Sequence, residues 1–312
     1  MQALVNIVLP IFAVVATGYL CGRGRLLGAA SSDALNLFVY WVALPALLFK
    51  AMAGVNLAQV LNLNFITAYT LAMFATWALS ALAAMALFGL SSAQGSLFGL
   101  NGAYANTGYM GIPLSIAAYG DEAALPSIVA TVISVLFITI AVIPVEISQQ
   151  RETRLLRTIG RVVRSLLRNP MLLAPIAGLA WAWFGRKLPV PLENFAGMLG
   201  AAAGPCALFS IGLFLVGKPL SQGTGQVAAM TVVKLLIHPL LTAAAIFTVF
   251  PTDPLWTKIA ILSAALPIGS GPFVLAQAKG VYVQPTSAAM LVTTILSVAT
   301  ISLFFVYFPA AG

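Results

Sequence analysis

Hydrophobic residues form long, nearly uninterrupted runs along this chain, and short polar connections separate them. An apolar run of about 20 residues is long enough to cross the hydrocarbon core of a bilayer as a helix. The pattern therefore predicts an all-α membrane protein with ten transmembrane helices. Their expected ranges are 2–21, 33–53, 62–89, 97–120, 123–146, 169–187, 192–217, 225–250, 255–280 and 285–309.

Two of these runs contain residues that interrupt a membrane helix. The stretch 101–120, NGAYANTGYMGIPLSIAAYG, combines glycines and a proline with asparagine side chains, and 265–280, ALPIGSGPFVLAQAKG, has the same character. Backbone that leaves a helix at membrane depth must be buried in protein or line a wet cavity. Interrupted helices of this kind build the substrate sites of many transporters. The pair predicts two halves of the chain that meet at one site.

Three landmarks recur along the chain after 159 or 160 residues. They are the Pro-x-x-Leu-Phe frame at 45–49 and 205–209, the breaks at Pro113 and Pro272, and the span-opening Pro126 and Pro285. This spacing predicts a duplication, with a first five-helix repeat at 1–146, a basic loop at 147–168 and a second repeat at 169–312. Because five is odd, the second repeat enters the membrane from the opposite side. The interrupted helices 4 and 9 are then expected to meet near the midplane.

Charge is scarce, and its distribution predicts an orientation. The chain is 61% hydrophobic and 7% charged, whereas a soluble domain carries roughly 25% charged residues. Little sequence remains outside the spans, so a soluble catalytic or nucleic-acid-binding domain is excluded. The net charge of +8 comes largely from six arginines between 151 and 168. We expect this segment to lie on the cytoplasmic leaflet as an amphipathic helix that contacts anionic lipid.

The loops on the side of that segment hold ten lysines and arginines, and the loops on the other side hold four. Cytoplasmic loops are the more basic ones, so both termini are expected outside, with Asp121 and Glu122 facing outward. The chain has two cysteines and one histidine. We therefore expect no disulfide, no metal site and no cofactor. The span interiors also lack a catalytic constellation, so the chain is not expected to be an enzyme.

Ionisable residues inside spans are rare here, and such residues are usually functional. Lys234 and His238 are four residues apart in span 8, so they share one helical face. One interpretation of Lys234 is structural, with its ammonium group bound to backbone carbonyls or a helix C-terminus. The other is that it balances the charge of a substrate. His238 is either a coupling-proton carrier or a hydrogen-bonded polar spot beside Pro239. Glu146, near the cytoplasmic end of span 5, is read as a topological or snorkelling residue.

The interrupted helices predict an anion site. Each break leaves a helix N-terminus with open N–H groups and about half a positive charge. The Asn106 amide can donate hydrogen bonds to a carboxylate, or it can cap the broken backbone. Tyr104, Tyr109, Ser270 and Gln277 either line the site or pack against neighbouring helices. The predicted substrate-binding residues are Asn106, Thr107, Gly108, Tyr109, Pro113, Pro267, Gly269, Ser270, Gly271, Pro272 and Lys234, with His238 as the coupling candidate.

The two motifs carry a resemblance to a known family. ANTGYMGIPL at 105–114 and ALPIGSGPFVLAQAKG at 265–280, with KLLIHPLL at 234–241, resemble spans 4, 9 and 8 of the auxin efflux carrier family. The resemblance covers the whole chain. It implies two inverted five-helix repeats, with helices 4 and 9 crossing at Pro113 and Pro272. It also implies a scaffold of helices 1, 2, 6 and 7 and an elevator-type transport domain of helices 3–5 and 8–10.

The resemblance implies a carrier of small organic anions such as auxin, malonate or other mono- and dicarboxylates. The long cytoplasmic loop of the plant members is missing, which favours a bacterial inner-membrane carrier that forms a homodimer. Two other functions stay open: an anion channel, and a sodium-coupled symporter of the bile-acid type. A sodium site usually needs converging oxygen ligands, and the breaks offer no carboxylate. Proton coupling and facilitated diffusion both remain compatible with the sequence.

Overall fold

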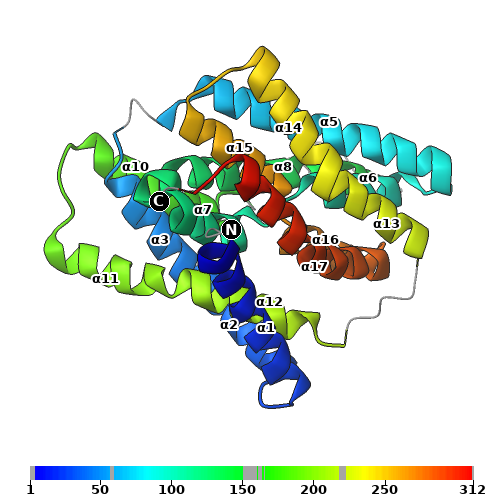
Figure 1. Cartoon of the computed structure of the whole chain (residues 1–312), viewed down its shortest axis with the longest axis horizontal. Coiled ribbons are helices and arrows are strands. Elements are labelled where there is room, and N and C mark those ends of the chain that lie inside the picture. Colours follow the sequence, from blue (N-terminus) through cyan, green and yellow to red (C-terminus); the bar gives the residue numbers. More distant parts are fainter. Residues whose placement is uncertain are drawn as a thin grey trace.

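The computed structural model describes residues 4–56, 60–149, 160, 164, 166–217 and 223–310. Within these residues the regular elements are helices, and the β-type pairing is a single isolated bridge. The all-α prediction is therefore confirmed for this part of the chain (Figure 1). In chain order the elements are η1 (Leu4–Val8), α1 (Leu9–Arg23), α2 (Ala29–Phe38), η2 (Val39–Ala43), α3 (Leu44–Ala53), α5 (Leu63–Phe88), α6 (Ser92–Ala103), η3 (Thr107–Gly111), α7 (Ile112–Tyr119), η4 (Asp121–Ala123), α8 (Ala124–Gln149), α10 (Pro170–Trp183), α11 (Val190–Ala201), α12 (Ala203–Leu215), α13 (Thr224–Val232), η5 (Val233–Ile237), α14 (His238–Ala244), η6 (Ala245–Val249), α15 (Pro254–Ala265), α16 (Ser270–Lys279) and α17 (Val283–Tyr307).

Seven helical segments of the described chain are long and apolar enough to cross a membrane. They are Asn6–Arg23, Ala29–Ala53, Leu63–Phe88, Asp121–Glu146, Val190–Leu215, Thr224–Val249 and Val283–Tyr307. The three other predicted spans correspond to α10, which has 14 residues, and to the two interrupted segments, each divided into shorter helices. The chain is thus a multi-pass membrane protein. The count of ten spans and the inverted repeat stay predictions.

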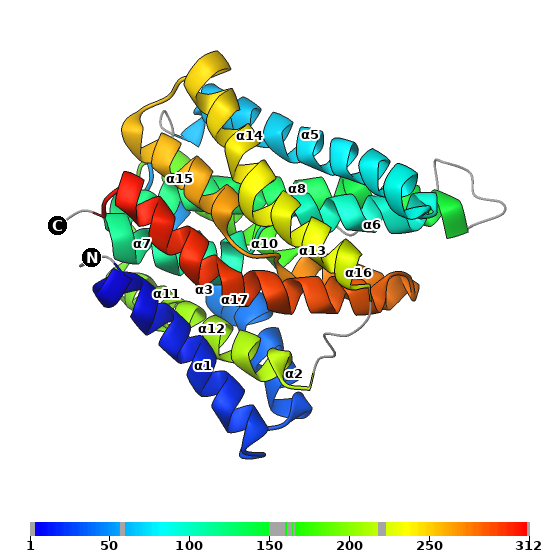
Figure 2. The same cartoon turned by 45° about the vertical axis from the view of Figure 1, so that its right-hand side comes forward.

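The helices pack in two groups; in Figure 2, α1, α2, α11 and α12 lie at the bottom of the view and α5 and α14 at the top. In the first, α1 packs along α12, α10 and α11 pack on α3, and α2 packs on α12. In the second, α5 packs on α6, α6 on α8, α13 on α17, and α14 on α15. We call these the scaffold group (α1, α2, η2, α3, α10, α11 and α12) and the crossover group (α5 to α8 and α13 to α17). That these groups are a scaffold and a transport domain, and that one moves against the other, stays a prediction.

Glycines let the scaffold helices approach one another at backbone distance. A Cβ atom on Gly18 of α1 would overlap the carbonyl oxygen of Phe209, and one on Gly212 of α12 would overlap that of Val15. Small residues at such contacts maximise van der Waals packing between membrane helices, where the surrounding lipid provides no hydrophobic driving force. The pair α1 and α12 is therefore held by close backbone packing.

An apolar seam joins the two groups next to the interrupted segments. Leu44 and Met171 of the scaffold group and Ile112 and Ile128 of the crossover group belong to one buried cluster. Its contacts are nonpolar, so dispersion and shape hold the groups together here rather than hydrogen bonds.

Both interrupted segments begin with strong helix caps. Ser91 and Gln94 form a capping box at the start of α6. The Asp253 side chain accepts the N–H of Trp256 at the start of α15. Caps of this kind satisfy the free N–H groups at a helix N-terminus. The predicted amphipathic helix at 151–168 lies mostly outside the described residues; Arg164 and Arg168 are described, and both are exposed.

Candidate functional site

The two interrupted segments lie side by side in the interior. Helix α6 ends at Ala103 and α15 at Ala265, and an antiparallel bridge joins Ala105 to Ile268. The N–H of Asn106 donates to the carbonyl of Pro267 at 2.9 Å, and the N–H of Gly269 donates to that of Tyr104 at 3.2 Å. The extended residues thus pair with each other, which satisfies backbone groups that no helix serves. The prediction that both helices are interrupted and adjacent is confirmed; we call this pairing the crossover.

The crossing point differs from the prediction. Pro113 and Pro272 were expected at the crossing, but the paired residues are Ala105 and Ile268. Both prolines lie in the first turn of the following helix, α7 or α16. Pro272 is tolerated there because no helical carbonyl needs its N–H in a first turn. Pro113 instead follows directly on η3, where the Ile112 N–H donates to the Thr107 carbonyl in a π-type bond.

Pro267, instead, explains where α15 stops. The residue before a proline avoids helical torsions, and Leu266 is extended, with φ −62° and ψ 156°. The end of α6 at Ala103 has no such local signal, since a tyrosine follows it and is already extended, with ψ 107°. The pairing with the second segment therefore fixes the first break.

Glycines give the crossover its compactness. A Cβ on Gly269 would come within 2.8 Å of the Tyr104 ring, and one on Gly271 within 2.9 Å of it. Gly108 faces the scaffold, where an added Cβ would lie 3.3 Å from the Met171 methyl group. The crossover thus sits against the apolar seam between the two groups.

Two helix N-termini converge on this pairing. Element η3 starts at Thr107 and continues into α7, and α16 starts at Ser270, each within two residues of the bridge. The first N–H groups of a helix lack intrahelical acceptors, and the macrodipole makes this end positive. The arrangement can bind an anion through backbone donors alone. The site residues predicted at 106–109 and 267–272 are brought together here, and Pro113 lies one turn further along.

Asn106 uses its backbone to organise the break. Its carbonyl accepts the N–H groups of Met110 at 3.2 Å and Gly111 at 3.0 Å. Its side chain makes no capping hydrogen bond to η3, and the residue is 7% exposed. The capping interpretation of the amide is therefore wrong. The side-chain amide remains available to a ligand.

Lys234 and His238 share one face, as predicted, and both are fully buried. The Lys234 ammonium group donates to the carbonyl oxygen of Ala264 at 2.5 Å and lies 3.2 Å from Nδ1 of His238. Ala264 is in the last turn of α15, next to the crossover. A cation at a helix C-terminus compensates the negative end of the helix dipole. The contact agrees with the structural interpretation of Lys234. It also places the ammonium group at the end of α15, next to the residues that leave the helix.

His238 keeps one ring nitrogen unused. Its Nε2 is buried and has no hydrogen-bond partner among the described residues. The ring of Tyr69 lies 6.3 Å away, centroid to centroid, and the Tyr69 hydroxyl is also buried without a partner there. Buried polar groups are normally hydrogen-bonded. These two groups are therefore among the buried polar atoms of the crossover group that lack a partner within the described residues.

Thr293 is a supporting residue whose role the sequence did not reveal. Thr131, Ser134 and Thr294, in the helices after the breaks, each donate to a carbonyl of their own helix. Thr293 also donates to its own helix, but its Oγ1 accepts the N–H of Ile268 at 3.2 Å. It therefore anchors the extended residue at the centre of the crossover. No local signal separates it from Thr294.

A solvent-accessible cavity of about 880 Å³ opens elsewhere, at the end of the two groups where α3, α7 and α15 meet. Its lining includes Lys50, Asp121, Glu122, Asp253 and Trp256. None of the predicted substrate-binding residues lines it. Asp121 and Glu122 are exposed and were expected to face outward.

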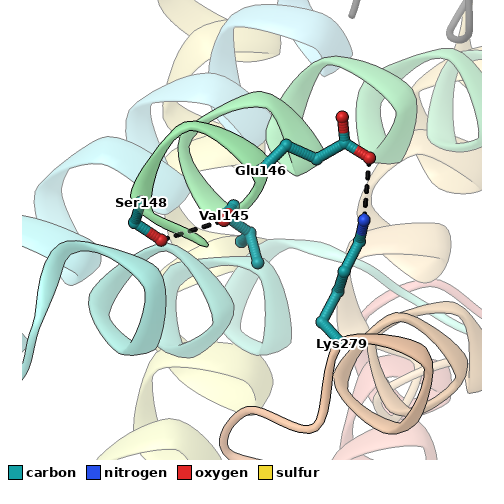
Figure 3. A network of polar contacts seen from close by, with 4 residues as sticks. All are labelled: Val145, Glu146, Ser148 and Lys279. Atoms are coloured by element: carbon teal, nitrogen blue, oxygen red, sulfur yellow. Dashed lines mark hydrogen bonds and ion pairs between the residues drawn. The ribbon is translucent and has the colours of Figure 1, made fainter. Parts of the chain in front are cut away.

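An ion pair joins two helices at the end of the crossover group that lies away from this cavity. Lys279, the last residue of α16, donates to Glu146 near the end of α8 at 2.8 Å (Figure 3). Both side chains are partly buried, at 23% and 12% exposed. Glu146 therefore pairs across two helices, which a purely topological role does not require. Cys21 and Cys206 are free, and the described residues contain no cluster that could hold a metal.

Comparison with known proteins decides the family. A family model described as membrane transport protein matches residues 3–305. The chain belongs to this family. It is 31% identical over 303 residues to the "Putative malonate transporter" of Rhizobium meliloti, covering 97% of this chain and 95% of that protein. It is 24% identical over 360 residues to auxin efflux carrier component 8 of Arabidopsis thaliana, covering 95% of each.

A third relative in the family is the Escherichia coli "Uncharacterized transporter YfdV", 22% identical over 305 residues with 95% of each chain covered. The resemblance to auxin efflux carriers is thus confirmed over almost the whole chain. Because the family and these relatives are transporters, this protein is a membrane transporter and not an enzyme.

Proposed function

We propose that this transporter carries a small organic anion, a mono- or dicarboxylate, and binds it at the crossover. The observation that carries the proposal is the antiparallel pairing of Ala105 with Ile268, because it brings the N-termini of η3 and α16 together in the interior. Two helix N-termini offer an anion several backbone N–H donors without a buried counter-ion. The relative from Rhizobium meliloti is named for malonate, a dicarboxylate.

The side chains around the crossover would add selectivity. The Asn106 amide is free of the η3 cap and would donate to a carboxylate oxygen. Ser270 would add a hydroxyl at the start of α16, and Gly108, Gly269 and Gly271 would let the substrate approach the backbone closely.

Alternating access would follow from the two-group architecture. The crossover group would slide along the apolar seam of the scaffold group and carry its bound anion from one side to the other. The buried side chains that meet at the seam are apolar on both sides, so a shift would break few hydrogen bonds between the groups. A homodimer held through the scaffold group, in a bacterial inner membrane with both termini outside, would keep the scaffold fixed.

Lys234 and His238 would link substrate binding at the crossover to the conformation of the interrupted segment after α15. Lys234 contacts Ala264 at the end of α15, so it would respond to an anion at the crossover through the backbone and would balance part of its charge. His238, in contact with Lys234, would take up the proton in a proton-coupled cycle. Uptake measured with and without a pH gradient tests this, and His238→Gln protein that stays pH-driven would remove that residue from the proposal.

Uptake of radiolabelled malonate by proteoliposomes tests the site. We expect Asn106→Ala to raise KM at least tenfold, because a hydrogen bond to a charged group contributes about 1.5–3 kcal/mol. Asn194→Ala is the matched control, since Asn194 is exposed on α11, and it is expected to match the wild type. Wild-type KM and rate in Asn106→Ala would refute the assignment. Unitary currents far above carrier rates would indicate an anion channel instead.

A further inference from the structure

Three buried polar side chains of the crossover group come together from three different elements. Lys234 of η5 and His238 of α14 are joined by the 3.2 Å contact between Nζ and Nδ1. The ring of Tyr69, on α5, lies 6.3 Å from the His238 ring, centroid to centroid. All three side chains are fully buried. We call Tyr69, Lys234 and His238 the polar triad.

The contact with Lys234 determines which nitrogen of the His238 ring carries the proton. An ammonium group has N–H donors and no acceptor, so it donates to Nδ1. In a neutral ring whose Nδ1 accepts, the proton lies on Nε2. This Nε2 is buried and has no hydrogen-bond partner among the described residues. The ring therefore presents an N–H donor at the nitrogen that Lys234 does not contact.

Tyr69 is the side chain in ring contact with this imidazole that carries a hydroxyl. The hydroxyl is buried, and the described part of the chain offers it no hydrogen-bond partner. Its ring stacks on Phe65 at 5.8 Å, and Phe65 packs edge-on against Trp256 at 4.8 Å, so aromatic packing holds the phenol in place. A hydroxyl both donates and accepts. It can therefore serve Nε2 whether or not that nitrogen carries a proton.

Few other ionisable groups lie near His238. Helix α14 packs mainly on α5, α15, η5 and η6. The ionisable side chains of these four elements are Tyr69 on α5, Lys234 on η5 and Lys258 on α15. The Lys258 ammonium group faces elsewhere, 5.2 Å from the centroid of the Tyr119 ring. Lys234 and Tyr69 are thus the described side chains with which His238 can exchange a proton.

This arrangement fits a short proton relay. We propose that the coupling proton rests on Lys234 and enters or leaves through the His238 ring and the Tyr69 hydroxyl. In the release step Lys234 passes a proton to Nδ1, Nε2 passes its proton to the Tyr69 oxygen, and the phenol passes its own proton to water. The triad ends with a neutral amine, a His238 proton on Nδ1 and a neutral phenol that donates to Nε2. One proton leaves, and no buried imidazolium forms.

The relay connects to the anion through the end of α15. Lys234 donates to the carbonyl of Ala264, three residues before Pro267 of the crossover. An anion at the crossover would stabilise the charged form of Lys234, and its departure would favour release of the proton. Anion and proton would then move in the same direction. The inference rests on the proposed function and adds Tyr69, which the sequence did not single out, as a relay residue.

Tyr69→Phe tests the relay because it keeps the ring and its stacking on Phe65 and removes only the hydroxyl. The wild type and the variant are reconstituted in proteoliposomes. Two rates are measured with labelled malonate: uptake driven by an imposed pH gradient, and exchange of internal for external malonate at equal pH. We expect gradient-driven uptake to fall at least tenfold, since a positioned proton-transfer group contributes roughly 100-fold or more. Exchange is expected to match the wild type, because it requires no net proton movement.

Ser287→Ala is the matched control. Its hydroxyl is also buried without a partner in the described chain, but it lies on α17, and the variant is expected to match the wild type in both assays. Gradient-driven uptake at the wild-type rate in Tyr69→Phe overturns the inference. An equal loss of both rates also overturns it, since the hydroxyl would then only support the fold, as does a wild type that ignores the gradient. These outcomes leave the anion site intact, whereas wild-type uptake by Asn106→Ala would refute the proposed function itself.

Discussion

Replacing Lys234 separates a structural role from a functional one. The side chain is fully buried, and within the described residues it makes no ion pair with a carboxylate. Lys234→Met keeps an unbranched side chain of similar length and removes the charge and the donor to Ala264. Losing a hydrogen bond from a charged donor costs about 1.5–3 kcal/mol. Removing a charge from the centre of a membrane helix recovers about 2.5–3.5 kcal/mol.

These two contributions nearly cancel. We therefore expect Lys234→Met to unfold within about 1 kcal/mol of the wild type. Lys234→Ala also removes about three buried methylene groups, each contributing about 0.8 kcal/mol. The alanine variant is expected to be about 2–3 kcal/mol less stable than the methionine variant. If Lys234 serves transport, both variants lose substrate-dependent uptake although only one is destabilised.

The assay is equilibrium unfolding in mixed micelles together with malonate uptake by proteoliposomes. A methionine variant as unstable as the alanine variant would mean that the ammonium group mainly locks α15, and would refute the balance given above. A stable methionine variant with wild-type uptake would remove Lys234 from the transport mechanism. A stable methionine variant without uptake is the result that the proposal requires.

Three further variants test the supporting structure. Thr293→Val leaves the Ile268 N–H unpaired. We therefore expect the unfolding free energy to fall by about 1–3 kcal/mol and the rate of uptake to fall as well. Wild-type values in both assays would contradict the anchoring role. Gly212→Ala forces a Cβ into the backbone of α1. We expect the unfolding free energy to fall by about 1–3 kcal/mol, measured by the same unfolding assay. An unchanged midpoint would be inconsistent with close packing of α1 and α12. Glu146→Gln removes a partly buried ion pair with Lys279; we expect a loss above the 1 kcal/mol typical of exposed pairs, and no loss would show that the pair is dispensable.

The sequence alone determined the class of protein and the place of its breaks. Apolar runs long enough to cross a bilayer indicate a membrane protein. The two glycine- and proline-rich interruptions, 159 residues apart at Pro113 and Pro272, located both crossover segments. Pro267 is a local signal, since it stops α15 whatever surrounds it. The family resemblance rested on these same motifs, which is why the comparisons confirmed it.

Tertiary structure decided how those segments meet. The first break follows Ala103 because Asn106 and Gly269 find hydrogen-bond partners on the other segment, and pairing across 163 residues leaves no local trace. The contact of Lys234 with Ala264 is equally non-local. Periodicity and propensity act over a few residues, whereas a binding site is assembled from contacts between segments that only the folded chain brings together.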